Sequence, residues 1–502
     1  MAHAITGSAE RVSNFEKPLT MFLGIDIGTS EVKAVLLSES HEVMGSAGAP
    51  LTVSRPFAGH SEQNPDDWWQ ATQLALGALR QSHPKAYAAV RGIGLSGQMH
   101  GAVLLDANDQ VLRPCILWND TRSAQECVDM MNEMPDLSQL AGSLAMPGFT
   151  APKLRWVKRH EPEIFAQVAK VLLPKDYVRL MLTGDHVTDM SDASGTLWLD
   201  VARRTWSDAL LGLTDLTSRH MPRLVEGSAA GGQLRADVAA RLGLPEGIVV
   251  AGGAGDNAAS AVGMGAVDTG QGFLSLGTSG VLFVVTPTFA PNAESATHAF
   301  CHALPQRWHQ MSVMLSAASC LQWVTGLLGA QSEGTLAEQA ATLSPKERAA
   351  APLFLPYLGG ERTPHNDGRV RGSFHGLDFE TDSARLAYSV LEGVTFGLRD
   401  GLAALKAAGS DVKGLSLVGG GARSAMWAQQ LASGLDIEIH THQGSTVGGA
   451  LGAARLGWLA TGAAQSDVCI APAIDTTFAP DPAEQEILLE RYAQFRQLYR
   501  RS

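Results

Sequence analysis

The stretch MFLGIDIGTSEVKAVLL, residues 21–37, decides the fold. Two runs rich in β-branched and apolar residues flank Gly28-Thr29-Ser30, and this pattern predicts a β-hairpin around a tight turn. The stretch QGFLSLGTSGVLFVV, residues 271–285, repeats it: when Gly277-Thr278-Ser279 is placed on Gly28-Thr29-Ser30, the apolar flanking positions coincide. The same hairpin therefore occurs twice, about half a chain apart, which favours two halves built on one common unit.

A second unit also recurs. The apolar run 248–251 enters the glycine turn 252–255, and the run 416–418 enters the glycine turn 419–421. A helix rich in small residues is expected after each turn. Strands that alternate with helices in this way predict an α/β protein. We expect three segments: a disordered leader over residues 1–20, a first lobe over 21–267 and a second lobe over 268–502.

The composition narrows the possible functions. The 502 residues carry a formal net charge of −12 and contain no run of Lys and Arg, which argues against nucleic acid as a partner. The five cysteines form no CxxC pair, a pattern typical of reduced thiols in a cytoplasmic protein. Residues 1–20 lack the apolar core of a secretory signal, and the uncharged segment 269–293 is broken by glycines and prolines. We therefore expect neither a signal peptide nor a membrane span.

Asp26 is the first candidate for chemistry. It lies in the first strand of the repeated hairpin, just before Gly28-Thr29-Ser30. The glycine lets the backbone approach an oxyanion, and the Thr and Ser hydroxyls with their N–H groups can donate to it. A carboxylate beside phosphate would repel it unless a cation lay between, so this pattern indicates Mg²⁺ held by Asp26 largely through water. The alternative is an aspartate that merely caps its own turn.

The presence of one such hairpin in each half suggests that the two halves share a ligand. One glycine–hydroxyl turn from each half could grip the phosphates of a nucleotide from two sides. In the second copy Ser275 stands where the first has Asp26. This difference is expected if only one half has to hold the metal.

Asp256 is the second candidate. It lies in GGAGDNAASAVG, residues 252–263, a loop that also matches the dinucleotide fingerprint GxGxxA. That fingerprint requires an acidic residue at the end of the next strand for the ribose, and LSLG at 274–277 has none. An aspartate in the loop fits a general base for a hydroxyl that attacks a γ-phosphate better than it fits a pyrophosphate site. The alternative is that Asp256 is only the N-cap of the following helix.

Several other residues are ambiguous from sequence alone. His298 and His302 flank Cys301 but have no carboxylate between them, so a core position is favoured over a metal site. Trp118 could face a substrate or simply pack, and Asp120 is a weaker candidate for a hydroxyl partner. Arg362 lies in a loop that approaches the expected cleft, but it is assigned no role.

The chain resembles the FGGY family of carbohydrate kinases from about residue 21 to about residue 458. The motifs that carry the resemblance include GIDIGTS (24–30), SGQMHG (96–101), MPGFTAPKLRWVKRHEP (146–162), LLPKDYVRLMLTG (172–184), the Asp256 loop, FLSLGTSG (273–280), LPYLGGERTP (355–364) and VGGGARS (418–424). The resemblance implies two actin-like, ribonuclease H-like lobes, each a mixed β-sheet flanked by helices, with ATP and a sugar meeting in the central cleft. It also implies ATP-dependent phosphorylation of a sugar hydroxyl.

The resemblance also implies roles for individual residues. Asp256 would be the catalytic base, and Asp26, with Gly28, Thr29 and Ser30, would hold the magnesium and phosphates of ATP. Gly277 and Thr278 would contact the γ-phosphate. Gly420, Gly421 and Ser424 would lie at the adenosine, although the family often has Asn at the position of Ser424.

Within the family, SGQMHG is the motif that points to D-xylulose as the substrate and D-xylulose 5-phosphate as the product. Met99 would supply an apolar wall, His100 a hydrogen-bond donor, and Asn257 with Asp256 further contacts to sugar hydroxyls. Kinases for another ketose, a polyol or a sugar acid stay open, as does a nucleotide-switched binding protein on the same fold. A homodimer is compatible with the sequence, which does not decide it.

Overall fold

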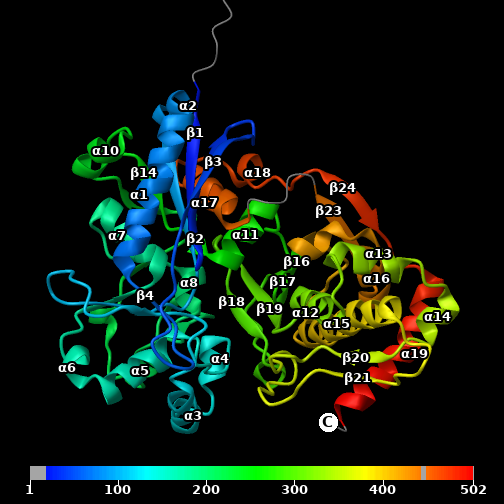
Figure 1. Cartoon of the computed structure of the whole chain (residues 1–502). Helices are drawn as coiled ribbons and strands as arrows, with labels where there is room; N and C mark the ends of the chain where they lie inside the picture. Colours follow the sequence, from blue (N-terminus) through cyan, green and yellow to red (C-terminus); the bar gives the residue numbers. More distant parts are fainter. Residues whose placement is uncertain (1–18, 443–447, 501–502) are drawn as a thin grey trace, which may run out of the picture.

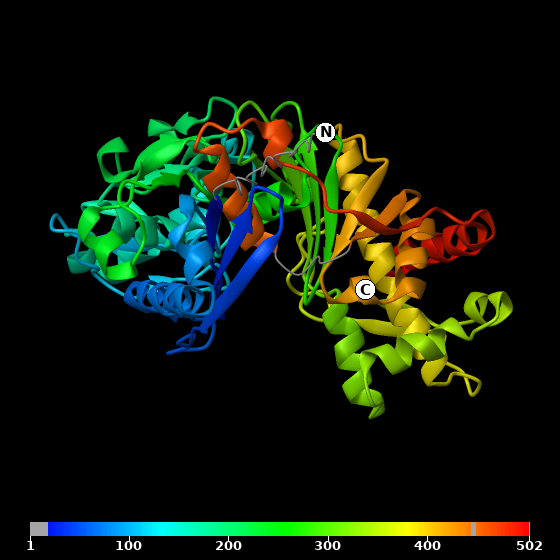
Figure 2. The same ribbon diagram turned by 90° about the horizontal axis from the view of Figure 1, so that it is seen from above.

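The computed structural model of the chain describes residues 19–442 and 448–500. Two mixed sheets, each of seven strands, lie side by side and carry helices on their faces (Figures 1 and 2). The strands of the first sheet are β13 (Ala230–Gln233), β14 (Val249–Ala251), β5 (Val90–Gly97), β1 (Met21–Ile27), β2 (Glu31–Ser38) and β3 (Val43–Pro50), with β15 (Ala254–Gly255) paired to β5. The expected two-lobed α/β fold is confirmed; of the expected leader, residues 1–18 lie outside the described part.

The second sheet repeats the plan of the first around its hairpin. Its strands are β18 (His298–Cys301), β19 (Trp308–Met314), β17 (Gly280–Thr286), β16 (Gly272–Leu276), β22 (Gly414–Val418), β23 (Glu438–His442) and β24 (Ile474–Phe478). In the first half β1 pairs antiparallel with β2 and parallel with β5, and in the second β16 pairs antiparallel with β17 and parallel with β22. The predicted duplicated hairpin is therefore present in both sheets, at equivalent positions.

Helices bury the faces of both sheets. The helix α1 (Pro65–Ser82) begins after Asn64, whose side chain accepts from the backbone N–H of Asp66 at 3.3 Å, and it buries Trp68 against the first sheet. The other principal helices are α5 (Thr150–His160), α7 (Pro174–Thr183), α11 (Asp256–Met264), α12 (Ala318–Leu328), α15 (Ser383–Ala407), α16 (Ala425–Leu435), α17 (Gly448–Leu459) and α19 (Pro482–Tyr499). None of the helices within 19–442 and 448–500 is both long and apolar enough to cross a membrane.

The helix α17 lies in the sequence between β23 and β24 of the second sheet, but it packs on the first sheet. Figure 1 shows it beside β1, and it also lies against α11. The approach is so close that a Cβ added at Gly24 would lie 2.0 Å from the carbonyl oxygen of Ala450, and one at Gly94 only 1.7 Å from that of Ala453. Glycine is thus required in the strands for backbone to meet backbone. The division of the chain at residue 267 stays a prediction, because α17 belongs to the second segment in sequence but packs on the first sheet.

Candidate active site

Asp26 lies near the carboxyl end of β1, where the strand runs parallel to β5 and Asp26 is level with Ser96. Its Oδ1 atom is buried and has no hydrogen-bond partner among the described residues. Burial raises the pKa of Asp26, although the Ser96 hydroxyl and the charge of Lys33 act against this. A buried carboxylate oxygen without a partner is the kind of atom that a hydrated cation or a ligand proton would satisfy.

The turn after β1 differs in detail from the expectation. The Thr29 hydroxyl donates to Oε1 of Gln98 at 3.0 Å and accepts from Nε1 of Trp118 at 3.0 Å. Gln98 in turn donates to Gln63, which donates to the backbone carbonyl of Thr29. The single proton of this hydroxyl is used within the protein, so the Thr29 hydroxyl has none to donate to a phosphate oxygen. Ser30 is exposed and Gly28 is half-buried, and the backbone N–H of Gly28 donates to the carbonyl of Glu31 at 3.0 Å.

The structure shows the surroundings of Trp118 and Asp120, two residues that were ambiguous from the sequence. Trp118 is 47% exposed, and its ring is held by the bond to Thr29, so it lies at the rim of the site and is not packed in the core. Asp120 is buried, and its oxygens accept from the backbone N–H of Ser61 and from the Arg122 guanidinium. Asp120 therefore has no free acceptor for a sugar and supports the loop.

Asp256 is the first residue of α11. Gly255 takes the N-cap position, so the alternative in which Asp256 is only the cap is wrong. The Oδ1 atom of Asp256 accepts from the backbone N–H of Asn257 at 2.7 Å and from its side-chain amide at 3.0 Å. Asn257 thus orients the carboxylate, and Oδ2 is left for a substrate. Burial, and then the charge of Asp26, raise the pKa of Asp256 to about 6.

Met99 and His100 follow β5 and approach the same place. Met99 packs so tightly on the Asp256 loop that a Cβ at Gly255 would lie 2.8 Å from its Cγ and Sδ atoms. His100 has a φ of 72°, in the left-handed region that non-glycine residues rarely adopt. The segment that delivers the two side chains is therefore bent sharply toward α11.

The hydrogen bonding of His100 differs from the expectation that it donates to a sugar hydroxyl. Its Nδ1 lies 2.7 Å from the carbonyl oxygen of Gly195, which can only accept, so Nδ1 carries the proton. Burial lowers the pKa of the ring to about 3, and the ring is neutral near pH 7. Nε2 is then an acceptor. His100 would receive a hydrogen bond from a sugar hydroxyl and not donate one.

Two residues that hold His100 were not predicted. The Lys153 Nζ atom and the Thr150 hydroxyl both donate to the backbone carbonyl of His100, at 2.8 and 3.1 Å. Lys153 is fully buried, and burial lowers its pKa to about 7. Both residues lie on α5, within the GFTAPKLRW segment, whose i, i+3 spacing could have indicated a shared face directed at one target.

The second half also reaches the sugar side of the site. Phe149 packs edge-on against His100 at 4.3 Å and against His298 at 5.7 Å, measured between ring centres. Arg362 Nη1 lies 3.3 Å from Nε2 of His298, whose Nδ1 lies 2.9 Å from the Ser143 hydroxyl. The charge of Arg362 also acts on His100. The sequence assigned no role to Arg362, because its loop is far from both motifs along the chain.

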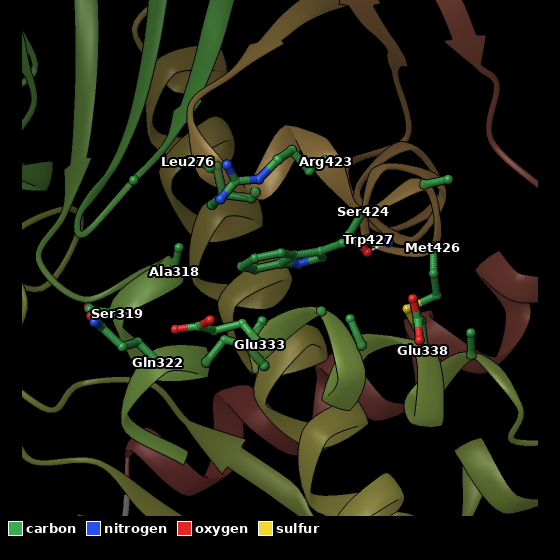
Figure 3. A pocket seen from close by; sticks show the side chains of 18 of the residues that line it. Leu276, Ala318, Ser319, Gln322, Glu333, Glu338, Arg423, Ser424, Met426 and Trp427 are labelled. Carbon is green, nitrogen blue, oxygen red and sulfur yellow. Dashed lines mark hydrogen bonds between the residues drawn. The ribbon is translucent and has the colours of Figure 1, made fainter. Parts of the chain in front are cut away.

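A cavity of about 630 Å³ opens between α12, α13 (Glu333–Ala341) and α16 in the second half (Figure 3). Five residues predicted to contact ATP line it together, from two separate segments: Gly277, Thr278, Gly420, Gly421 and Ser424. In Figure 3 the ring of Trp427 lies near the centre of the view, between Arg423 and Glu333; it is buried and forms part of the cavity wall. Its size and its mixed lining suit a nucleoside.

Ser424 has a structural duty in this cavity. It is the N-cap of α16, and its hydroxyl accepts from the backbone N–H of Trp427 at 3.3 Å. The hydroxyl therefore satisfies the helix terminus first. Its contact with a base stays a prediction, whereas the cavity wall that it helps to form is evident.

The arrangement is that of a two-lobed actin-like fold, with a cavity lined by two glycine turns in the second half and the half-buried Asp256 carboxylate in the first. Models of the FGGY family of carbohydrate kinases match the chain, the N-terminal domain over residues 21–263 and the C-terminal domain over residues 272–461. The chain belongs to this family and is an enzyme, a carbohydrate kinase that takes ATP as its co-substrate.

Several relatives are similar over nearly their whole length. The xylulose kinase of Escherichia coli K12 is 51% identical over 483 residues, which cover 95% of this chain and 98% of that protein. The xylulose kinase of Klebsiella pneumoniae is 53% identical over 442 residues, 88% of this chain and 90% of that protein. The crystal structure of a xyloylose kinase from Brucella ovis matches with a TM-score of 0.93 at 51% identity, over 95% of this chain and 98% of that one.

Proposed function

We propose that this enzyme transfers the γ-phosphoryl group of ATP to the 5-hydroxyl of D-xylulose and releases D-xylulose 5-phosphate and ADP. The observation that carries the proposal is the half-buried Asp256 carboxylate, which has one oxygen fixed by Asn257 and a pKa raised to about 6, next to the Met99 side chain that packs on its loop. The similarity to xylulose kinases at 51–53% identity supports the choice of sugar.

In this proposal Asp256 is the general base. The sugar hydroxyl donates its proton to Oδ2 as its oxygen bonds to the γ-phosphorus, and the bond from that phosphorus to the bridging oxygen of ADP breaks. A base works best when its pKa lies near the working pH, because it is then ionised and still basic enough to take the proton. Asn257, which holds Oδ1, limits the rotation of the carboxylate and keeps Oδ2 directed at the acceptor.

We propose that the base of ATP enters the cavity of the second half and that the phosphates extend past Gly277 and Thr278 toward Asp26. Backbone N–H groups at glycine turns suit phosphate oxygens, since no side chain blocks their approach. The Gly28 turn would contribute its backbone, because the Thr29 hydroxyl is already bonded to Gln98.

Asp26 is the residue that would hold Mg²⁺. Its buried, unpartnered Oδ1 fits an ion that prefers one or two carboxylates together with water and substrate phosphates. When bound there, the ion would neutralise phosphate charge beside two carboxylates. Within the protein itself, Asp26 also acts on the pKa of Asp256 through its charge.

A coupled assay of ADP release over a panel of sugars tests the proposal. The panel contains D-xylulose, L-xylulose, D-ribulose, glycerol and gluconate, each with ATP and Mg²⁺. We expect kcat/KM for D-xylulose to exceed every other value by at least about tenfold, the discrimination that a few hydroxyl contacts provide. Preference for another member would assign a different kinase of the same family, and ADP release that no sugar stimulates would favour a nucleotide-switched binding protein.

A further inference from the structure

One very short helix, α8 (Met190–Ser194), supports two parts of the proposed sugar site, the Asp256 loop and the His100 side chain. The Ser191 hydroxyl accepts from the backbone N–H of Gly255, the residue before Asp256, at 3.2 Å. Gly195, which ends α8, accepts from His100 Nδ1 at 2.7 Å. The same single turn of helix therefore bonds both to the loop that carries Asp256 and to the ring of His100.

The end of α8 is also closely packed against the side chains of Met99 and His100. A Cβ at Gly195 would lie 2.6 Å from two atoms of the His100 ring and 2.8 Å from the Met99 methyl group. Met99 also packs on Gly255, so its side chain fills the space between α8 and the Asp256 loop. In a close-packed site such contacts transmit a shift of α8 directly to both side chains.

A fully buried ionic cluster fixes α8. The N-cap of the helix is Asp189, whose Oδ2 accepts from the backbone N–H groups of Ser191 and Asp192, at 2.7 and 3.3 Å, and from the Ser191 hydroxyl. The Lys175 Nζ atom lies 2.6, 2.9 and 3.0 Å from the carboxylates of Asp176, Asp189 and Asp192. All four of these charged side chains are inaccessible to solvent.

The same helix α7 that carries Lys175 also holds the Asp256 loop. One turn further along α7, the buried Arg179 guanidinium donates to the backbone carbonyls of Ala251 and Gly252. The glycine loop therefore bonds to α7 through Arg179 and to α8 through Ser191. Lys175 joins the two helices to each other.

We propose that this group, formed by Lys175, Arg179, Asp189 and Ser191 and called here the α7–α8 support, is a positioning device that sets Asp256 relative to His100 during phosphoryl transfer. The inference rests on the proposed function, in which these two residues act on one sugar. Burying charges contributes little net stability, and well-packed apolar residues would often serve equally well. A network of directed bonds that ends on the base loop and on His100 has instead the geometry needed for orientation, where an error of about 1 Å can cost about 100-fold in rate.

Ser191→Ala is the test, because it removes the acceptor for Gly255 N–H. It also removes the hydroxyl donor to Asp189, but it keeps the three ion pairs of Lys175 and the backbone N–H groups that cap α8. The matched control is Ser389→Ala, which removes an equally buried hydroxyl from α15 in the other half, where it donates to the carbonyls of Pro352 and Arg385. Both variants lose one buried hydroxyl, so a purely structural effect should appear as a similar fall in Tm.

We expect Ser191→Ala to lower kcat at least tenfold relative to Ser389→Ala, with the Kd for ADP changed less than twofold in a direct titration. A second variant, Arg179→Lys, keeps the positive charge but cannot donate to the carbonyls of Ala251 and Gly252 in the same two-bond geometry. It should lower kcat in the same way. A kcat of Ser191→Ala within twofold of the control would overturn the inference, as would a parallel loss of ADP affinity. The comparison is made with whichever sugar the wild type turns over fastest, so an error in the proposed substrate does not affect it.

Discussion

The charge of Asp26, near the end of β1, acts on Asp256, the first residue of α11. Together with burial, which is the larger cause, the negative charge of Asp26 raises the pKa of Asp256 to about 6. Asp256 does not line the cavity of the second half, in which we propose that ATP binds. Binding of ATP and activation of the sugar hydroxyl should therefore be separable by mutation of Asp256.

Asp256→Ala should abolish phosphorylation and leave nucleotide binding intact. We expect kcat to fall by at least about 10²- to 10⁴-fold, the usual contribution of a general base. Calorimetric titration with ADP should give a Kd within about twofold of the wild type. A variant that keeps comparable turnover would show that another group removes the proton.

The pH dependence of activity should follow the raised pKa of Asp256. Only the ionised carboxylate accepts a proton, so kcat/KM should decrease tenfold per pH unit below about 6, and not below about 4 as for an ordinary aspartate. A profile from pH 4.5 to 8.5, measured at saturating ATP with the sugar below its KM, checks this. An activity that stays constant down to pH 5 would contradict the assignment.

The same raised pKa predicts a cost in stability. A carboxyl whose pKa is higher in the folded state binds its proton more tightly there, so its contribution to stability is lost as the pH rises from about 4 to about 6. Asp256→Asn removes that cost. After allowance for screening by solvent, we expect a gain of about 1 kcal/mol in the free energy of unfolding at pH 7.5. Denaturant titrations of both proteins at pH 7.5 and pH 4 should show the gain at the higher pH only.

The two equivalent threonines of the hairpins should respond differently to substitution. Thr29→Val removes the donor to Oε1 of Gln98 and the acceptor for the Trp118 indole, which should cost about 1–3 kcal/mol of stability. Thr278 lines the nucleotide cavity, so Thr278→Val should instead lower kcat/KM for ATP by about tenfold, with little change in Tm. Thermal unfolding and steady-state kinetics of the pair decide this. Equal effects of the two substitutions on ATP would mean that both hydroxyls contact phosphate.

Lys153→Met should weaken sugar binding specifically. The bond from Nζ to the carbonyl of His100 helps to hold His100 in its left-handed conformation, which is unfavourable by about 1–3 kcal/mol without support. We expect KM for the sugar to rise at least about tenfold while KM for ATP stays the same. The control is Lys158→Met on the same helix, because Lys158 is exposed, pairs with Asp215 and lies over the ring of Phe165. A similar rise in both variants would refute the positioning of His100 by Lys153.

Much of the candidate site could be predicted because its motifs are local. The hairpin turns, the glycine loop with Asp256 and the strand that ends at Met99-His100 are each encoded within about ten residues, where side-chain period and glycine content constrain the backbone directly. The order of these motifs, with the hairpin repeated in each half, predicted two related lobes and an inter-lobe ligand. Details that depend on a distant partner, such as the His100 tautomer set by the carbonyl of Gly195, could not be predicted.

The amino-acid sequence by itself determined the two hairpins, the position of Asp256 on its glycine loop and the class of reaction. Only the tertiary structure decided that the Thr29 hydroxyl is bonded to Gln98, that Lys153 holds His100, that Arg362 contacts His298, and that α8 bonds to both His100 and the Asp256 loop. The physical reason is the range of the interactions. Backbone conformation follows from neighbours along the chain, whereas the partner of a buried polar group depends on which distant segments the packing of the core brings beside it.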